Sequence, residues 1–188
     1  MSWNTFKSNM LRYMQNQNGI NSYNDFASKL TNEYDACIRR GTQTINNIPI
    51  QTPNKALMLT LVTAACQMAL TKRSGNHTFI DDIGKGVIGY WTGATLVIGI
   101  PPPIPATGAI LNVTTTSAFV TNPGTWSPVG PTPPLTDSAV FLDMLTAAMI
   151  AHSATPQGLY LTISNYPGFP LVPPAPGVLN FTGWTVPG

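Results

Sequence analysis

Apolar residues recur every three or four positions through most of the first ninety residues, which is the spacing of one face of an α-helix. Residues 3–17 and residues 23–40 follow this pattern, and the second segment has the clearer stripe. That stripe consists of Phe26, Leu30, Tyr34, Cys37 and Ile38. Ser22 precedes the second segment as an N-cap, and Gly41 is placed to close it. The pattern predicts two amphipathic helices.

Two further segments before residue 100 also have helical character. Pro53 suits the first turn of a helix capped by Thr52 and running to about residue 73. This segment is apolar nearly all round, which is typical of a central, buried helix. A fourth helix is expected over residues 79–92. The pair Asp81 and Asp82 would lie in its first turn, where the helix dipole favours negative charge.

The texture changes after the proline run that begins at residue 101. Residues 109–120 are β-branched and predict a strand or hairpin, whereas residues 127–135 hold four prolines and predict a loop. A fifth helix is expected over residues 137–153, capped by Thr136. A short strand follows at residues 159–163. The tail from residue 167 is expected to be extended and to lie over the protein's own core or over a neighbour.

These elements predict a mainly α fold of four to five helices, with short β-strands and long Pro/Gly-rich segments in the C-terminal half. Residues 1–188 form a single domain in this interpretation, helical over 1–100 and Pro/Gly-rich over 101–188. A faint echo links residues 100–112 with residues 172–180. Each follows a helix and runs from prolines through glycine and aliphatic residues to Leu-Asn. Duplication and chance convergence both explain this echo.

Charge is the strongest anomaly of composition. Only 9% of the residues are charged, against about 25% in a typical domain. All nine Lys and Arg residues precede residue 86, and residues 86–188 contain only two acids, Asp137 and Asp143. A polar but uncharged surface would explain this. Burial in an assembly explains it better, because interface cores are depleted of charge. The basic residues form no dense run, so no nucleic-acid partner is expected.

Candidate chemistry is sparse. The histidines, His77 and His152, have no partner at metal-binding spacing, and no HExxH or CxxC motif occurs. His152 is expected at the surface or near the dipole of its helix C-terminus. Residues 84–89 match the dinucleotide pattern GxGxxG but lack a preceding strand and a following acid, so close helix packing explains them better. We therefore expect no catalytic, cofactor-binding or metal-binding residues and no enzymatic activity.

Two other features bear on the class of protein. Cys37 and Cys66 lie in helical segments, and buried free thiols are favoured over a disulfide between helices. The apolar stretches 56–70 and 86–100 are too short for a membrane span, which needs about 20 residues, and are interpreted as buried core segments. No secretory signal is expected at the N-terminus.

Three segments resemble virion structural proteins of tailed bacteriophages of the T4-like type. They are residues 26–35, residues 89–94 (Gly-Tyr-Trp-Thr-Gly-Ala) and residues 101–112. The resemblance implies a virion protein that is assembled in the host cytoplasm, packs with its own copies or with other virion proteins, and needs no cofactor. It carries no functional residue over to this chain. The alternatives are a membrane-associated phage protein and a small ligand-binding module or enzyme.

Overall fold

The computed structural model describes residues 1–16, 22–43, 50–71, 78–98, 116–133, 137–162 and 177–186. The helices are α1 (Trp3–Asn16), α2 (Tyr23–Ile38), α3 (Lys55–Thr71), α4 (Phe79–Trp91) and α5 (Ser138–Ser153). The strands are β1 (Thr42–Gln43), β2 (Ile50–Thr52), β3 (Thr95–Ile98), β4 (Thr116–Asn122), β5 (Gln157–Thr162), β6 (Gly177–Thr182) and β7 (Trp184–Thr185). The fold is mainly α, as predicted.

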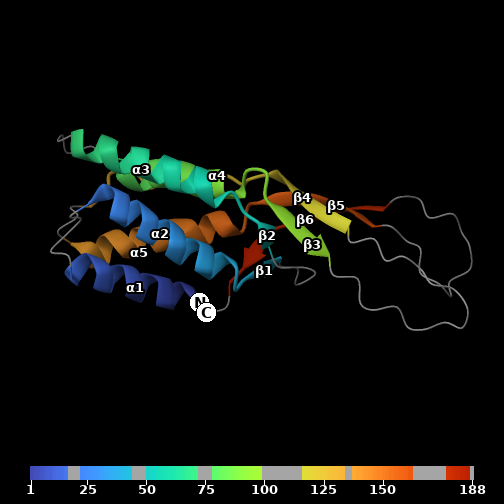
Figure 1. The fold of residues 1–188 in the computed structure, drawn as a ribbon, viewed down its shortest axis with the longest axis horizontal. Coiled ribbons are helices and arrows are strands. Elements are labelled where there is room, and N and C mark those ends of the chain that lie inside the picture. Colours follow the sequence, from blue (N-terminus) through green and yellow to red (C-terminus); the bar gives the residue numbers. More distant parts are fainter. Residues whose placement is uncertain are drawn as a thin grey trace, which may run out of the picture.

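The helices pack into one body, and an antiparallel sheet extends from one end of it (Figure 1). The sheet has five strands in the order β2-β3-β4-β5-β6, and β1 pairs separately with β7. Helix α4 contacts both α3 and α5, while α1 contacts α2 and α5. The helical body therefore carries the sheet as a projection.

Aromatic side chains fill the core where the helices meet the sheet. The rings of Tyr34 and Tyr90 meet edge to face at 5.0 Å, and Trp91 meets Trp184 at 5.3 Å. Two buried hydrogen bonds fix these rings, because Trp91 Nε1 donates to Tyr34 Oη at 3.0 Å and Trp184 Nε1 donates to the Ile38 carbonyl at 3.0 Å. Trp184 belongs to the predicted extended tail, so at this position the tail covers the protein's own core.

Three predicted helix ends can be compared with the structure. Ser22 caps α2, since its hydroxyl accepts from the Asp25 amide at 3.3 Å. The prediction that Thr52 caps the third helix is wrong: Thr52 ends β2, and Asn54 caps α3 through the Leu57 amide. Helix α5 is capped by Asp137, while Thr136 lies outside the described residues.

The expected position of α3 is also wrong. The third helix was predicted to be central because it is apolar all round, but its outward positions are exposed at Ala56, Leu59, Thr60 and Ala64. Helix α4 is the better-buried helix. An apolar residue on α3 that points outward cannot be told from one that points inward by periodicity alone.

The glycines of the GxGxxG pattern serve close packing, as the sequence indicated. A Cβ atom on Gly86 would lie 2.7 Å from Val62 Cγ2, and one on Gly89 would lie 2.8 Å from Leu61 Cδ1, both on α3. A Cβ on Gly84 would lie 2.4 Å from the indole of Trp126. The pattern therefore marks two packing contacts of α4, one with α3 and one with Trp126.

Gly41 likewise owes its identity to packing. It was predicted to close α2, yet a Cβ at this position would lie 2.4 Å from Trp184 Nε1. Its backbone is not in the left-handed region that favours glycine. Trp184, near the other end of the chain, leaves no room for a side chain at position 41. The preference for glycine after a helix therefore explains only part of why Gly41 is a glycine.

The order of elements repeats. Helix α4 is followed by a three-residue connection, β3 and β4, and α5 is followed by a three-residue connection, β5 and β6. Strand β3 was missed by the sequence analysis, which treated residues 86–100 as one buried segment. Most of the proline-rich echo lies outside the described residues, in 99–115 and 163–176, so the repetition observed is one of secondary structure.

Candidate assembly surface

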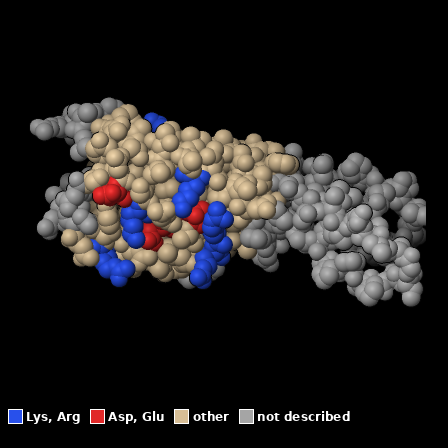
Figure 2. All heavy atoms as spheres, in the orientation of Figure 1, with Lys and Arg blue, Asp and Glu red and all other residues tan. Residues whose placement is uncertain are grey.

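The five-stranded sheet contains no charged residue. Strands β2 to β6 hold no Lys, Arg, Asp or Glu. Figure 2 shows the described charges on the helical body and an uncharged surface where the sheet begins. The two acids of the second half both serve α5: Asp137 caps it, and Asp143 pairs with Lys7 of α1. The charge shortage is thus concentrated in the sheet.

One side of this sheet is exposed at Thr52 and Phe119, and the backbone register identifies the row of positions to which these two residues belong. Residues directly opposite one another in antiparallel strands share a face of the sheet. The row consists of Thr52, Thr95, Phe119, Leu159 and Asn180, one from each strand. The hydroxyls of Thr52 and Thr95 are hydrogen-bonded to each other. We call this side of the sheet the open face.

Phe119 is the centre of the open face. It lies on the middle strand, and 59% of its surface is exposed, more than for any other large apolar residue that the structure describes. Its neighbour Val120 points to the other side and is buried with Ile50 and Leu96 in the main core. The helical body thus covers one face of the sheet and leaves the ring of Phe119 exposed on the other.

The segment after β4 is held against the helices by several hydrogen bonds, three of which end on one carboxylate, while the Ile80 amide of α4 donates another to Thr132 Oγ1 at 3.1 Å. We call residues 123–133, which have no helix or strand, the strap. Asp81 accepts hydrogen bonds from Trp126 Nε1 at 3.1 Å, from the Val129 amide at 2.8 Å and from the Gly130 amide at 3.3 Å. The role predicted for Asp81, pairing with the helix dipole, is therefore incomplete.

His152 was expected at the surface or near the dipole of its helix C-terminus; it lies in the last turn of α5, but it is buried beneath the strap and not at the surface. Only 1% of it is exposed, and its ring lies 6.0 Å from that of Trp126. Burial lowers the pKa of His152 to about 4, and the Pro123 carbonyl opposes part of that effect. Among the described residues neither ring nitrogen has a hydrogen-bond partner of good geometry. His77 lies outside the described residues.

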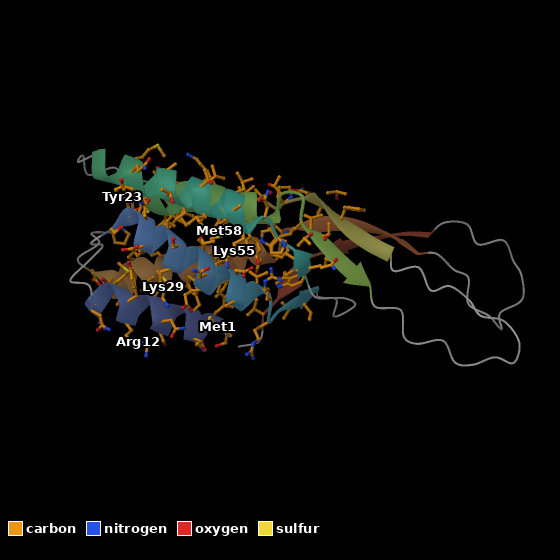
Figure 3. All side chains as sticks on the ribbon, in the orientation of Figure 1. Met1, Arg12, Tyr23, Lys29, Lys55 and Met58 are labelled. Atoms are coloured by element: carbon orange, nitrogen blue, oxygen red, sulfur yellow. The ribbon has the colours of Figure 1, made fainter. Side chains whose placement is uncertain are left out.

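The buried acids of α2 are paired. Asp35 accepts from Tyr90 Oη at 2.8 Å and from Arg39 Nε at 3.0 Å, and Lys55 Nζ, at the start of α3 (Figure 3), lies 3.4 Å away. Burial, and then the Asp35 charge, raise the pKa of Tyr90. Glu33 pairs with Lys29 at 2.5 Å. These contacts join α2 to α3 and α4, which makes the carboxylates structural.

Metal and thiol chemistry have little support in the described part of the chain. No group of three His, Cys, Asp or Glu residues there could hold a metal ion. Cys37 and Cys66 are free and buried, as favoured from the sequence. Burial raises the pKa of both thiols to about 12, so at neutral pH they are protonated and poorly nucleophilic.

Comparison with models of known protein families, with curated proteins and with solved structures finds no match. Among the helices that the structure describes, none is long and apolar enough to cross a membrane. The open face therefore has to be interpreted from its own physical chemistry.

Proposed function

We propose that this protein is a structural component of a larger assembly and acts by packing the open face of its sheet against copies of itself or other proteins. The observation that carries the proposal is Phe119, exposed at the centre of an uncharged sheet. Soluble domains normally use surface charge to discourage association. This sheet lacks that protection.

The free energy gained by burying Phe119 is large enough to contribute to association. Burying a phenylalanine fully stabilises by roughly 1.5–3 kcal/mol. Since 59% of Phe119 is exposed, covering it would contribute on the order of 1–2 kcal/mol per copy. This is a useful part of an interface energy but is too small alone, so the neighbouring uncharged residues must also be covered.

The resemblance to virion proteins of tailed bacteriophages suggests the setting. In that setting the protein would be made in the host cytoplasm and incorporated into the particle, with no cofactor and no catalytic step. The pairing of the buried acids is in keeping with a structural role, because Asp35 joins α2 to α4 through Tyr90 and Glu33 joins α2 to α1 through Asn9 Nδ2, at 2.8 Å.

The test is a pair of lysine substitutions. Phe119→Lys places a charge on the open face, where the exposure of the native side chain leaves the monomer fold intact. Ile150→Lys is the matched control, since Ile150 is 44% exposed but lies on helix α5 and on no strand of the sheet. Light scattering after size exclusion should show that Phe119→Lys weakens association while Ile150→Lys does not. Equal behaviour of the two variants would refute the proposal.

A further inference from the structure

The two edges of the sheet are treated differently by the fold. Strand β2 is only three residues long, its register with β3 shifts between Ile50 and Thr52, and Arg39 Nη1 donates to the Gln51 carbonyl at 3.4 Å. Short length, an irregularity and a basic side chain are the devices by which proteins prevent edge-to-edge pairing. The β2 edge is protected by all three.

The opposite edge, β6, has none of these devices. All six of its residues, Gly177 to Thr182, pair with β5 without a register shift. The strand contains no charged residue and no proline. Within the described part of the chain, no strand pairs with β6 on the side away from β5. At its end Gly183, with φ of +88°, turns the chain away, and its amide donates to the Pro156 carbonyl at 3.0 Å.

A regular, uncharged edge strand offers a row of backbone donors and acceptors to another strand. The outward N–H and C=O groups of β6 match those of an identical strand that runs in the opposite direction. Such pairing follows a two-fold axis and closes at two copies. A charged partner would find no complementary charge along β6, whereas the β6 strand of a second copy is uncharged and equal in length.

We propose that β6 pairs antiparallel with β6 of a second copy, which joins two five-stranded sheets into one continuous sheet. This inference rests on the proposed function and specifies its partner. The two-fold axis of an antiparallel pair stands perpendicular to the sheet, so both open faces lie on the same side. The two Phe119 residues would then belong to one wide uncharged surface, available for the next layer of an assembly.

Amide hydrogen exchange tests the pairing directly. In an edge strand, successive N–H groups point alternately to the neighbouring strand and to solvent. At about 5 μM, alternate amides from Val178 to Thr182 should exchange quickly; at about 500 μM the fast ones should slow more than about tenfold. If the alternation is unchanged at a concentration where the protein is associated, the inference is refuted.

Adjacent proline substitutions give an independent test. Leu179→Pro and Asn180→Pro each remove one N–H, and only one of these two faces outward. That variant should keep the wild-type circular dichroism spectrum, since an edge strand tolerates proline there, and should be unable to form the two-fold pair. The other should disrupt the β5–β6 pairing. The hydrogen-exchange measurement, which uses the unmodified chain, covers the case in which both proline variants unfold.

The outcomes separate the two proposals. Dimers of the unmodified chain that are lost in the folded β6 variant support the inference. Association that survives in the folded β6 variants refutes the β6 pairing and leaves the proposed function standing. An unmodified chain that stays monomeric at about 500 μM, which means that association is weaker than about −4.5 kcal/mol, refutes both.

Discussion

Acidification should destabilise the protein through His152. The imidazole is 1% exposed and has no partner of good geometry on either nitrogen among the described residues, so the folded state favours its neutral form. Its pKa falls from 6.5 to about 4 on folding. Between these two values the unfolded chain binds more protons, and stability therefore falls as pH decreases.

The size of the effect follows from the shift. One unit of pKa corresponds to about 1.4 kcal/mol, so the whole displacement is worth roughly 3 kcal/mol below pH 4. Between pH 7 and pH 5 the expected loss from this group is about 2 kcal/mol. Because the ring is buried, little solvent screening reduces this figure.

Urea denaturation at pH 7 and pH 5 measures the loss, and His152→Asn supplies the comparison. The variant has no group that titrates in this range at position 152, so its free energy of unfolding should fall less than that of the native chain by about 2 kcal/mol. Parallel pH dependence in the two proteins would refute the argument, and so would an NMR titration that places the folded pKa of His152 near 6.5.

Three further changes test contacts in the helical body. Asp81→Ala should lower the free energy of unfolding by about 2–4 kcal/mol, because it leaves three donors of the strap without their acceptor. The fluorescence of Trp126 should shift as well. Asp25→Ala, at an exposed site, is the control. Gly86→Val should cost about 1–3 kcal/mol in chemical denaturation by overpacking the α3–α4 contact. Tyr90→Phe removes a donor from a buried carboxylate and should lower the free energy of unfolding by about 1–2 kcal/mol; no change would mean that the remaining basic partners suffice.

Local signals were enough to place most helices. The helix at residues 23–38 combines an apolar stripe with a side-chain cap at Ser22, and both features can be recognised within a short window. Helix α5 was placed equally well at residues 138–153. Strand β3, separated from the end of α4 by three residues, was missed because its apolar residues belong to the same apolar stretch of sequence as that helix, and only pairing with β4 reveals them as a strand.

The contacts that define the open face and the strap are not local. Asp81 binds residues more than forty positions later in the chain, and nothing in its own neighbourhood indicates this. His152 was expected at the surface or near the dipole of its helix, and its neighbours in the sequence do not indicate that the strap covers it. The exposure of Phe119 depends on which face of β4 meets the helices, and alternation alone leaves this undecided because both faces of the strand carry apolar residues, Phe119 on one and Val120 on the other.

We propose above that the uncharged sheet is covered by other protein in an assembly. Sedimentation velocity of the unmodified chain from about 1 to about 100 μM tests it most directly, since this range spans association free energies near −5 to −8 kcal/mol. We expect a sedimentation coefficient that rises with concentration toward that of a dimer or a larger species. A single monomeric species across the whole range would contradict it.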